Sequence, residues 1–110
     1  MECKRVKIST TVPLDSVEAV RQAIGDAGAG QIGNYSHCSF SHIGQGRFMP
    51  NDEANPHIGE AGKLEVVEEE HIEVVCDRSI AKQVLQALRE AHPYEEVIAD
   101  IVPLLDEEDL

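Results

Sequence analysis

One strand-and-helix pattern occurs twice in this sequence, and it limits the folds open to the chain more than any other feature. In the first copy, apolar and polar residues alternate from Lys4 to Val12, as in a half-buried strand, and apolar residues then recur at helical spacing from Val17 to Ala27. Segment 8–24 overlays segment 72–88 without gaps. Two such halves that pair into one sheet give an α+β, ferredoxin-like plait (βαββαβ) with both helices on one face.

The helix ends carry their own signals. Asp15 and Ser16 are good N-cap residues for the first helix, and Asp77 can cap the second. Gly28 and Gly30 are expected to end the first helix by adopting positive φ, and Pro93 ends the second. Because these glycines follow a helix and precede a strand, they do not form a dinucleotide-binding loop, which has the opposite order.

The stretch between the two copies is expected to hold a second strand and a long connection. Strand patterning runs from Ile32 to Ser41. Gly44-Gln45-Gly46 signals a turn, after which residues 47–49 could return as a short hairpin arm. Residues 50–62 have the composition of a loop. Strand patterning returns at 63–76, and a last strand is predicted at 97–104. An extended hairpin or loop therefore separates strands two and three.

Alternation along the predicted second strand decides which of its side chains face the helices. Cys38 and Phe40 are expected beneath the helices. The side chains expected on the open face are Tyr35, His37, Ser39 and Ser41. An open sheet face on a small domain usually meets another copy of the chain, so we expect a homo-oligomer; a trimer and a dimer both cover such a face.

Length and charge set the class of protein and its partners. A chain of 110 residues makes one domain, at 1–105, followed by an acidic tail at 106–110. The net charge of −12 repels phosphate backbones and anionic lipid, which makes cations or a basic protein better partners than nucleic acid or a membrane. The sequence has no run of the roughly 18 apolar residues that a membrane span needs. Its three widely spaced cysteines fit a reducing cytoplasm.

Several residues suggest metal binding without forming a site by spacing alone. Cys38 and His42 would lie roughly 13 Å apart on one strand, too far for one ion. A divalent metal site would need His37, Cys38 and His42 to converge from different subunits. The alternatives are a buried, inert Cys38 and an interface hydrogen bond at His37. His57 is expected in solvent, His92 at a helix end, and the acidic run 68–70 on a solvated face.

Six short motifs together resemble the inserted PII/CutA-like domain of the YqfO-type, NGG-interacting-factor-like proteins, here standing alone. They lie at 28–35, 38–40, 44–46, 54–56, 58–59 and 91–96, and the similarity covers about 4–104. The motif residues carried over as ligand or interface candidates are Gly33, Asn34, Tyr35, His37, Cys38, Ser39, Phe40, Asn55, Pro56, Gly59, His92, Pro93, Tyr94, Glu95 and Glu96. One departure is Val97, where relatives usually carry proline.

The resemblance implies a ferredoxin-like fold and favours a trimer. Full-length relatives carry a dinuclear metal site in a separate, larger domain, and none of its ligands maps onto this chain. We therefore expect a small, noncatalytic cytoplasmic binding or regulatory protein with no cofactor, whose 41–70 loop contacts a protein partner. A CutA-like divalent metal-binding protein is the alternative, and a metal-dependent hydrolase comes third. PII proteins bind nucleotides, but the negative charge disfavours ATP here.

Overall fold

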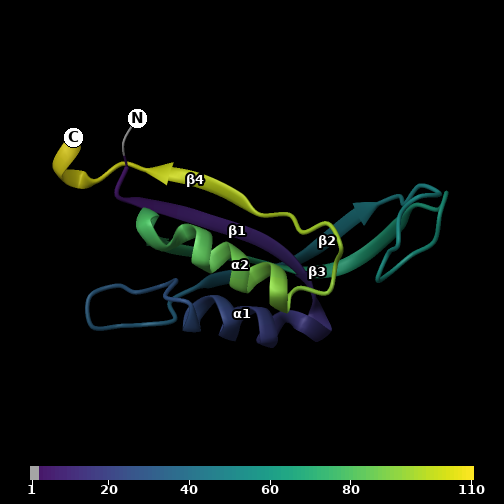
Figure 1. The fold of residues 1–110 in the computed structure, drawn as a ribbon, viewed down its shortest axis with the longest axis horizontal. Helices are drawn as coiled ribbons and strands as arrows, with labels where there is room; N and C mark the ends of the chain where they lie inside the picture. The colour runs from purple at the N-terminus through teal and green to yellow at the C-terminus, as the bar shows by residue number, and fades with distance from the viewer. Residues whose placement is uncertain (1–2) are drawn as a thin grey trace.

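The computed structural model describes residues 3–110, which form a four-stranded sheet and two helices (Figure 1). The elements follow in the order β1 (Arg5–Pro13), α1 (Val17–Asp26), β2 (Phe40–Phe48), β3 (Glu65–Asp77), α2 (Ala81–Ala91) and β4 (Asp100–Leu104). Three short 3-10 turns accompany them, at Leu14–Ser16, Arg78–Ile80 and Glu107–Asp109.

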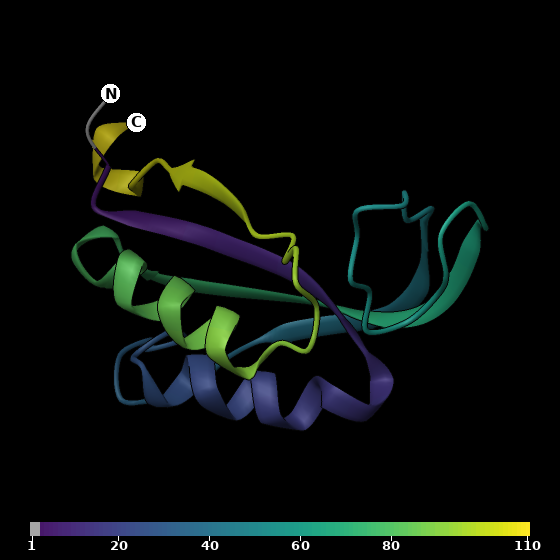
Figure 2. The same cartoon turned by 45° about the vertical axis from the view of Figure 1, so that its right-hand side comes forward.

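The sheet has the order β2-β3-β1-β4, with every neighbouring pair antiparallel. The two central strands pair along their length, with Ile8 opposite Val74 and Thr10 opposite Ile72. Both helices lie against the same face (Figures 1 and 2). This arrangement confirms the predicted ferredoxin-like plait.

The internal repeat is confirmed by the element boundaries. Each central strand runs into a 3-10 turn and then a helix, and Pro13, Leu14 and Val17 are displaced from Asp77, Arg78 and Ala81 by the same offset that relates Ile8 to Ile72. The core fills the space between the helices and the sheet. Its buried apolar residues are Val6, Ile8, Val12, Val17, Val20, Ile24, Ala29, Ile72, Val74, Cys76, Val84, Leu85 and Leu88.

The second strand lies further along the chain than predicted. β2 begins at Phe40, and the Gly44-Gln45-Gly46 segment, expected to turn, lies within it opposite Glu69, Glu68 and Val67. Glycine punctuation misled the prediction because a strand also accepts glycine where another group approaches its backbone closely. The connection between β2 and β3 is a loop at 49–64, close to the loop predicted at 50–62.

Residues 27–39 form a loop instead of a strand. Gly30 closes it, because its N–H donates to the Val75 carbonyl at 2.8 Å and its carbonyl accepts from the Cys38 N–H at 3.0 Å. Gly28, Gly30 and Gly33 all have positive φ, as expected for backbone roles. A Cβ at Gly30 would overlap the Cys38 backbone, so this position requires glycine.

One helix cap agrees with the prediction and the other does not. Ser16, one of the two predicted residues, holds the N-cap position of α1, whereas Asp77 ends β3 and Ile80 holds the N-cap position of α2; neither N-cap makes a side-chain capping bond. At the C-terminal end, Asp106 of the acidic tail is half-buried and pairs with Arg5 at 3.3 Å. The tail is thus anchored at its first residue. Among residues 3–110, neither helix is long and apolar enough to cross a membrane.

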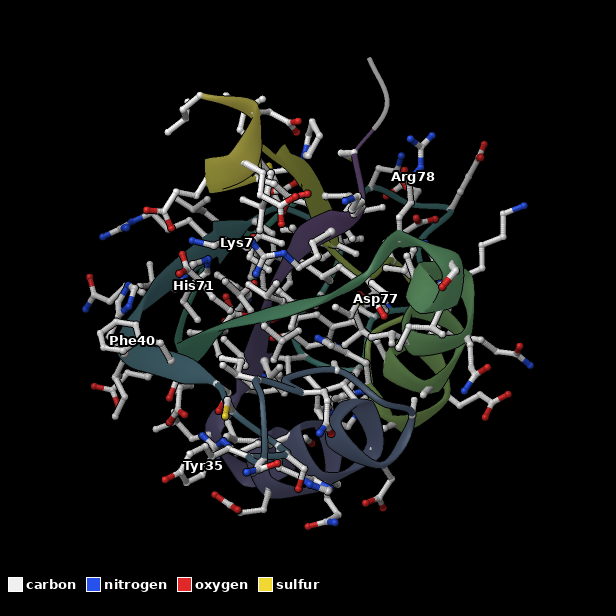
Figure 3. All side chains as sticks on the ribbon, turned by 90° about the vertical axis from the view of Figure 1, so that its left-hand side faces the viewer. Lys7, Tyr35, Phe40, His71, Asp77 and Arg78 are labelled. Carbon is white, nitrogen blue, oxygen red and sulfur yellow. The ribbon has the colours of Figure 1, made fainter. Side chains whose placement is uncertain are left out.

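The sheet face away from the helices carries a different set of side chains from the one predicted. Phe40 and His42 lie opposite Glu73 and His71, so this pairing places all four on the open face. Figure 3 shows Lys7, Phe40 and His71 on this side of the sheet, whereas Tyr35 lies beside α1. Ser41 faces the helices, where its hydroxyl accepts from Arg21 at 3.5 Å.

Candidate functional site

The best-defined concave site is a cavity of about 700 Å³ at the far end of the β2–β3 hairpin, here called the hairpin pocket. Three segments build it: the end of β2, the 49–64 loop, and the segment between α2 and β4. Figure 2 shows the loop turning up from the hairpin toward that last segment. The lining residues are Thr11, Gly46, Arg47, Phe48, Met49, Pro50, Asn51, Glu53, Ala54, Pro56, His57, Ile58, Glu69, Tyr94, Glu95, Glu96 and Ile98.

The segment 92–98 occupies the free edge of β1 beyond the point where β4 stops pairing. His92 is 6% exposed, and its Nε2 lies 2.8 Å from the Thr11 carbonyl. Its Nδ1 accepts from the Tyr94 N–H at 3.1 Å, so Nε2 carries the proton and donates to Thr11. Thr10 donates from Oγ1 to the Ile98 carbonyl at 2.7 Å. These bonds replace the missing strand ladder and fix where Tyr94 points.

A buried carboxylate lies at the centre of the pocket. Glu69 is 7% exposed, and the Tyr94 hydroxyl donates to its Oε2 at 2.9 Å. Burial, and after it the hydrogen bond to Glu69, raises the pKa of the Tyr94 phenol, which therefore stays protonated. Gly46 makes this arrangement possible, because a Cβ there would overlap the Glu69 carboxylate.

Aromatic rings surround Tyr94 and complete one wall. Its ring centroid lies 4.9 Å from that of His92, 6.0 Å from Phe48 and 6.3 Å from His57. The loop is tied to this wall because the Asn55 N–H donates to Glu95 Oε2 at 2.6 Å. The pocket thus combines an aromatic and apolar wall with carboxylates.

The charge of the lining is strongly biased. The lining contains four carboxylates, those of Glu53, Glu69, Glu95 and Glu96. It contains one Lys or Arg side chain, that of Arg47. Arg47 donates to Gln45 at 3.0 Å, and the ion pairs formed within residues 3–110 do not include Glu69. A carboxylate that is buried without a cation attracts positive charge and repels phosphate.

Part of the predicted motif set meets in this pocket. Pro56, Tyr94, Glu95 and Glu96 line it, while Asn55 and His92 hold its segments in place. Two further members, Pro93 and Gly59, lie in the same segments but do not line the pocket. Pro93 is half-buried after α2, and Gly59 has a φ of 98° in the loop.

The remaining motif residues lie elsewhere. Gly33, Asn34, Tyr35, His37, Cys38 and Ser39 belong to the 27–39 loop, and Phe40 is the first residue of β2. Figure 1 shows this loop at the end of the molecule opposite the hairpin. The two groups of motif residues therefore do not form one site within the chain.

His37 and Cys38 do not occupy the places that the sequence predicted. The His37 ring packs on Gly25 at the end of α1, with Nε2 3.0 Å from Asp26 and Nδ1 2.9 Å from Ser36. The hydrogen bond from His37 is the largest cause of the lowered pKa of Asp26. Cys38 is half-buried in the loop, not beneath the helices, whereas Cys76 is buried as expected. Their strand assignment was wrong, so their predicted faces were wrong too.

His42 lies on the open face, apart from His37 and Cys38, and its ring centroid lies 5.0 Å from that of His71. His42 is thus a strand residue, whereas His57 is exposed in its loop as predicted. Residues 3–110 contain no group of three or more His, Cys, Asp or Glu side chains placed to hold one metal ion. Within a single chain, the predicted trio does not converge.

Sequence reasoning missed Glu69 and His71. The acidic run was expected on a solvated face, but only Glu68 is exposed there; Glu69 is buried in the pocket and Glu70 pairs with Arg21 of α1. Alternation along β3 could have separated these residues, because it sends 69 and 71 to one face and 70 to the other. The same alternation places His71 opposite His42.

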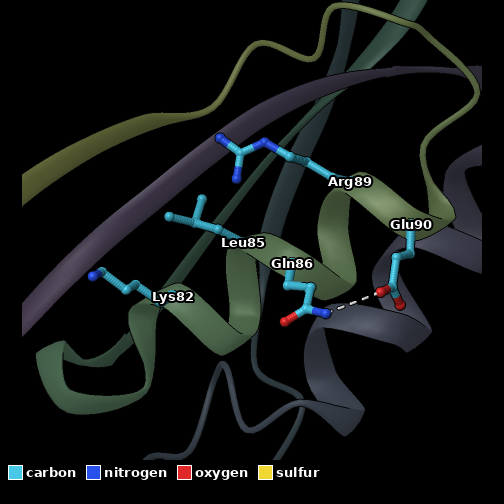
Figure 4. A pocket seen from close by; sticks show the side chains of 5 residues that line it. All are labelled: Lys82, Leu85, Gln86, Arg89 and Glu90. Atoms are coloured by element: carbon cyan, nitrogen blue, oxygen red, sulfur yellow. Dashed lines mark hydrogen bonds between the residues drawn. The ribbon is translucent and has the colours of Figure 1, made fainter.

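A second hollow, of about 410 Å³, runs along α2 (Figure 4). All of its lining side chains, from Lys82 to Glu90, come from that one helix, and Gln86 donates to Glu90 at 3.2 Å. Because no other element contributes a side chain, this hollow brings no distant groups together. The hairpin pocket remains the better candidate.

Comparison with known proteins finds relatives that match most of this chain over a part of their own length. Over 98 residues the chain is 51% identical to the GTP cyclohydrolase 1 type 2 homolog of Bacillus subtilis (strain 168). The matched region covers 89% of this chain and 26% of that protein. It is 50% identical over 94 residues to the protein of the same name from Mycobacterium leprae (strain TN). The chain spans about a quarter of the length of these curated relatives. No family model matches it.

Solved structures show the same relationship. A Bacillus cereus protein related to NIF3 matches with a TM-score of 0.81 and 46% identity, over 94% of this chain and 26% of that one. CutA1 from the psychrotrophic bacterium Shewanella sp. SIB1 matches with a TM-score of 0.72 over 96% of this chain and 86% of that one, at 15% identity. The chain is thus similar to a segment of NIF3-related proteins, and it has the fold of CutA1.

Proposed function

We propose that this chain is a noncatalytic binding domain that self-associates and takes a positively charged group into the hairpin pocket. One observation carries the proposal: the Glu69 carboxylate is buried there against a neutral phenol. A buried carboxylate without a cationic partner is costly, and a cation placed beside it would lower that cost. The pocket is therefore better suited to an organic cation than to an anion.

The walls narrow the class of ligand. Phe48, Tyr94 and His57 offer ring faces, and a cation over an aromatic face gains about 0.5–2 kcal/mol. Met49, Pro56 and Ile98 add apolar surface. An ammonium or guanidinium group on an apolar stem fits this lining, whether as a free small molecule or as a basic side chain of a partner protein.

The same charges disfavour a nucleotide. Four lining carboxylates and a net charge of −12 oppose a triphosphate. The relatives are named for a GTP cyclohydrolase, but that name applies to proteins about four times as long, and we do not extend it to this chain. The raised pKa of Tyr94 means that its phenol is protonated and acts in the pocket as a hydrogen-bond donor to Glu69.

Self-association is the second part of the proposal, with a trimer favoured and a dimer as the alternative. The hairpin reaches beyond the helices in Figure 1, and the exposed fractions of Ile43, Leu64 and Val66 on it are 61%, 61% and 50%. Phe40 on the open face is 68% exposed. Large apolar side chains exposed to this extent favour burial against another chain. A cytoplasmic location is supported by the free thiols of Cys3, Cys38 and Cys76.

Calorimetric titration with two matched ions tests the binding proposal. Butylguanidinium and butyrate share the apolar stem and differ in charge. We expect saturable binding of butylguanidinium alone, weakened at least about tenfold in Glu69→Gln. Glu90→Gln, on the outer side of α2, is the control and should bind as the unchanged chain does. Equal binding of both ions, or no effect of Glu69→Gln, would refute the proposal.

Native mass spectrometry of protein purified without a histidine tag tests self-association separately. The proposal predicts an assembly of defined subunit number, with three copies favoured. A monomer at every concentration that keeps the fold would contradict this part and leave the ligand test unaffected.

A further inference from the structure

We propose that His42 and His71 form a binding site for a divalent late transition metal ion on the open face of the sheet. The two residues lie directly opposite each other on β2 and β3, so their side chains leave the sheet side by side. Their ring centroids are 5.0 Å apart, with an interplanar angle of 53°. This site is independent of the hairpin pocket.

The spacing of the rings suits a chelate. With metal–nitrogen bonds of about 2.0–2.1 Å and a tetrahedral angle, two imidazoles on one ion have centroids roughly 5 Å apart. The observed centroid spacing is therefore compatible with two imidazole ligands on one ion. Because strands hold both residues, the arrangement is also more rigid than one built on loops.

Within residues 3–110, no hydrogen bond of the structure uses a ring nitrogen of this pair. Nδ1 of His71 is buried and has no hydrogen-bond partner in the described structure. His92 and His37 differ, since each has both ring nitrogens in hydrogen bonds. Without such bonds, the protein fixes no tautomer at His71, and the ring can present a free lone pair to a metal.

The negative charge around the histidine pair favours the binding of a cation. Glu73 lies two residues from His71 on the same face, and its pairing with Lys7 at 3.6 Å is long and partly exposed. The net charge of the chain is −12. Imidazole ligands suit Ni²⁺, Cu²⁺ and Zn²⁺, whereas Mg²⁺ and Ca²⁺ prefer oxygen ligands. Water or a carboxylate would complete the coordination.

This assignment changes which residues a metal test should target. Of the predicted trio His37, Cys38 and His42, the proposal keeps only His42 and adds His71. His37 therefore serves as a matched control: it is also a histidine, but its ring is bonded to Asp26 and Ser36.

The first test is calorimetric titration of the tag-free chain with Ni²⁺, a probe that prefers imidazole to the oxygen ligands elsewhere on the surface. We expect one ion per chain, with binding weakened at least about tenfold in His42→Ala and in His71→Ala. His37→Ala and Cys38→Ser should bind Ni²⁺ as the unchanged chain does. Circular dichroism checks that each variant is folded.

A second readout avoids substitutions altogether. Ni²⁺ is paramagnetic, so substoichiometric addition should broaden the ring signals of His42 and His71 first in histidine-labelled NMR spectra. Broadening centred on His37, His57 or His92 would overturn the proposal. Absence of saturable Ni²⁺ binding, or an equal loss in the His37→Ala control, would overturn it as well.

Discussion

The Tyr94 hydroxyl donates a 2.9 Å hydrogen bond to the buried carboxylate of Glu69, and this contact joins the segment after α2 to the middle of β3. The two residues are 25 positions apart in the sequence and lie on either side of α2 along the chain. Because the bond also closes one wall of the hairpin pocket, it links the stability of the chain to the proposed site.

Replacing Tyr94 with Phe should lower the free energy of unfolding by about 1–3 kcal/mol, because it leaves a buried carboxylate without its donor. Tyr35→Phe is the matched control: Tyr35 is 73% exposed, so the same loss of a hydroxyl should change stability by less than about 0.5 kcal/mol. Urea denaturation of the two variants measures both values. Equal effects would show that the Tyr94–Glu69 bond contributes nothing measurable.

Alkaline titration should show that Tyr94 resists ionisation in the folded chain. Tyr94, with its raised pKa, should stay protonated while the chain is folded. The folded state then binds more protons than the unfolded state above about pH 10, so stability contributed by Tyr94 is complete below that pH and falls as the pH rises. In the Tyr35→Phe variant, which leaves Tyr94 as the one tyrosine, tyrosinate absorbance should appear only as the chain unfolds. A tyrosinate transition near pH 10 while this variant is still folded would be the contrary result.

Two glycines of β2 should respond differently to alanine. Gly46 has the Glu69 carboxylate where its Cβ would lie, whereas a Cβ at Gly44 would meet nothing within 4 Å. Gly46→Ala should therefore push Glu69 away from Tyr94 and weaken both stability and cation binding. Gly44→Ala should be neutral or stabilising by up to about 1 kcal/mol, because a strand interior prefers alanine to glycine. Thermal unfolding and ligand titration of both variants test this contrast.

Self-association should depend on the open face. Phe40→Glu places a charge where an apolar side chain is 68% exposed, so it should shift the assembly toward monomer. Ile32→Glu is the control, because Ile32 is similarly exposed, at 57%, but lies in the 27–39 loop. Light scattering after size-exclusion chromatography measures the mass of each. If only Ile32→Glu dissociates the assembly, the interface lies on the loop and not on the sheet.

The sequence predicted those elements whose pattern is set by the core. The two central strands and both helices bury regular apolar stripes, so the spacing of apolar residues was enough to predict where these elements lie. β2 was misplaced because much of it lies beyond the helices, where Gly44 and Gly46 carry no side chain and no apolar stripe is required. The register of β2 depends on its pairing with β3, and the local sequence of β2 carries no information about that pairing.

Some residues of the hairpin pocket could be singled out from the sequence, but only as members of a motif. The motif at 91–96 includes His92, Tyr94 and Glu95, and these residues build or line the pocket. Alternation separates Glu69 from Glu68 and Glu70, but the burial of Glu69 could not be predicted, because it depends on the space left by Gly46 and on the donor from Tyr94. Contacts between distant segments decide which carboxylate is buried, and composition does not.

The most direct test of the central claim is a residue-resolved NMR titration of the isotope-labelled chain with butylguanidinium. The proposed function predicts saturable amide shifts clustered at Gly46, Phe48, Glu69 and Tyr94, which Glu69→Gln abolishes and an equal concentration of butyrate does not reproduce. Shifts that are absent, that cluster along α2 or in the 27–39 loop, or that butyrate produces equally would contradict a cation site in the hairpin pocket.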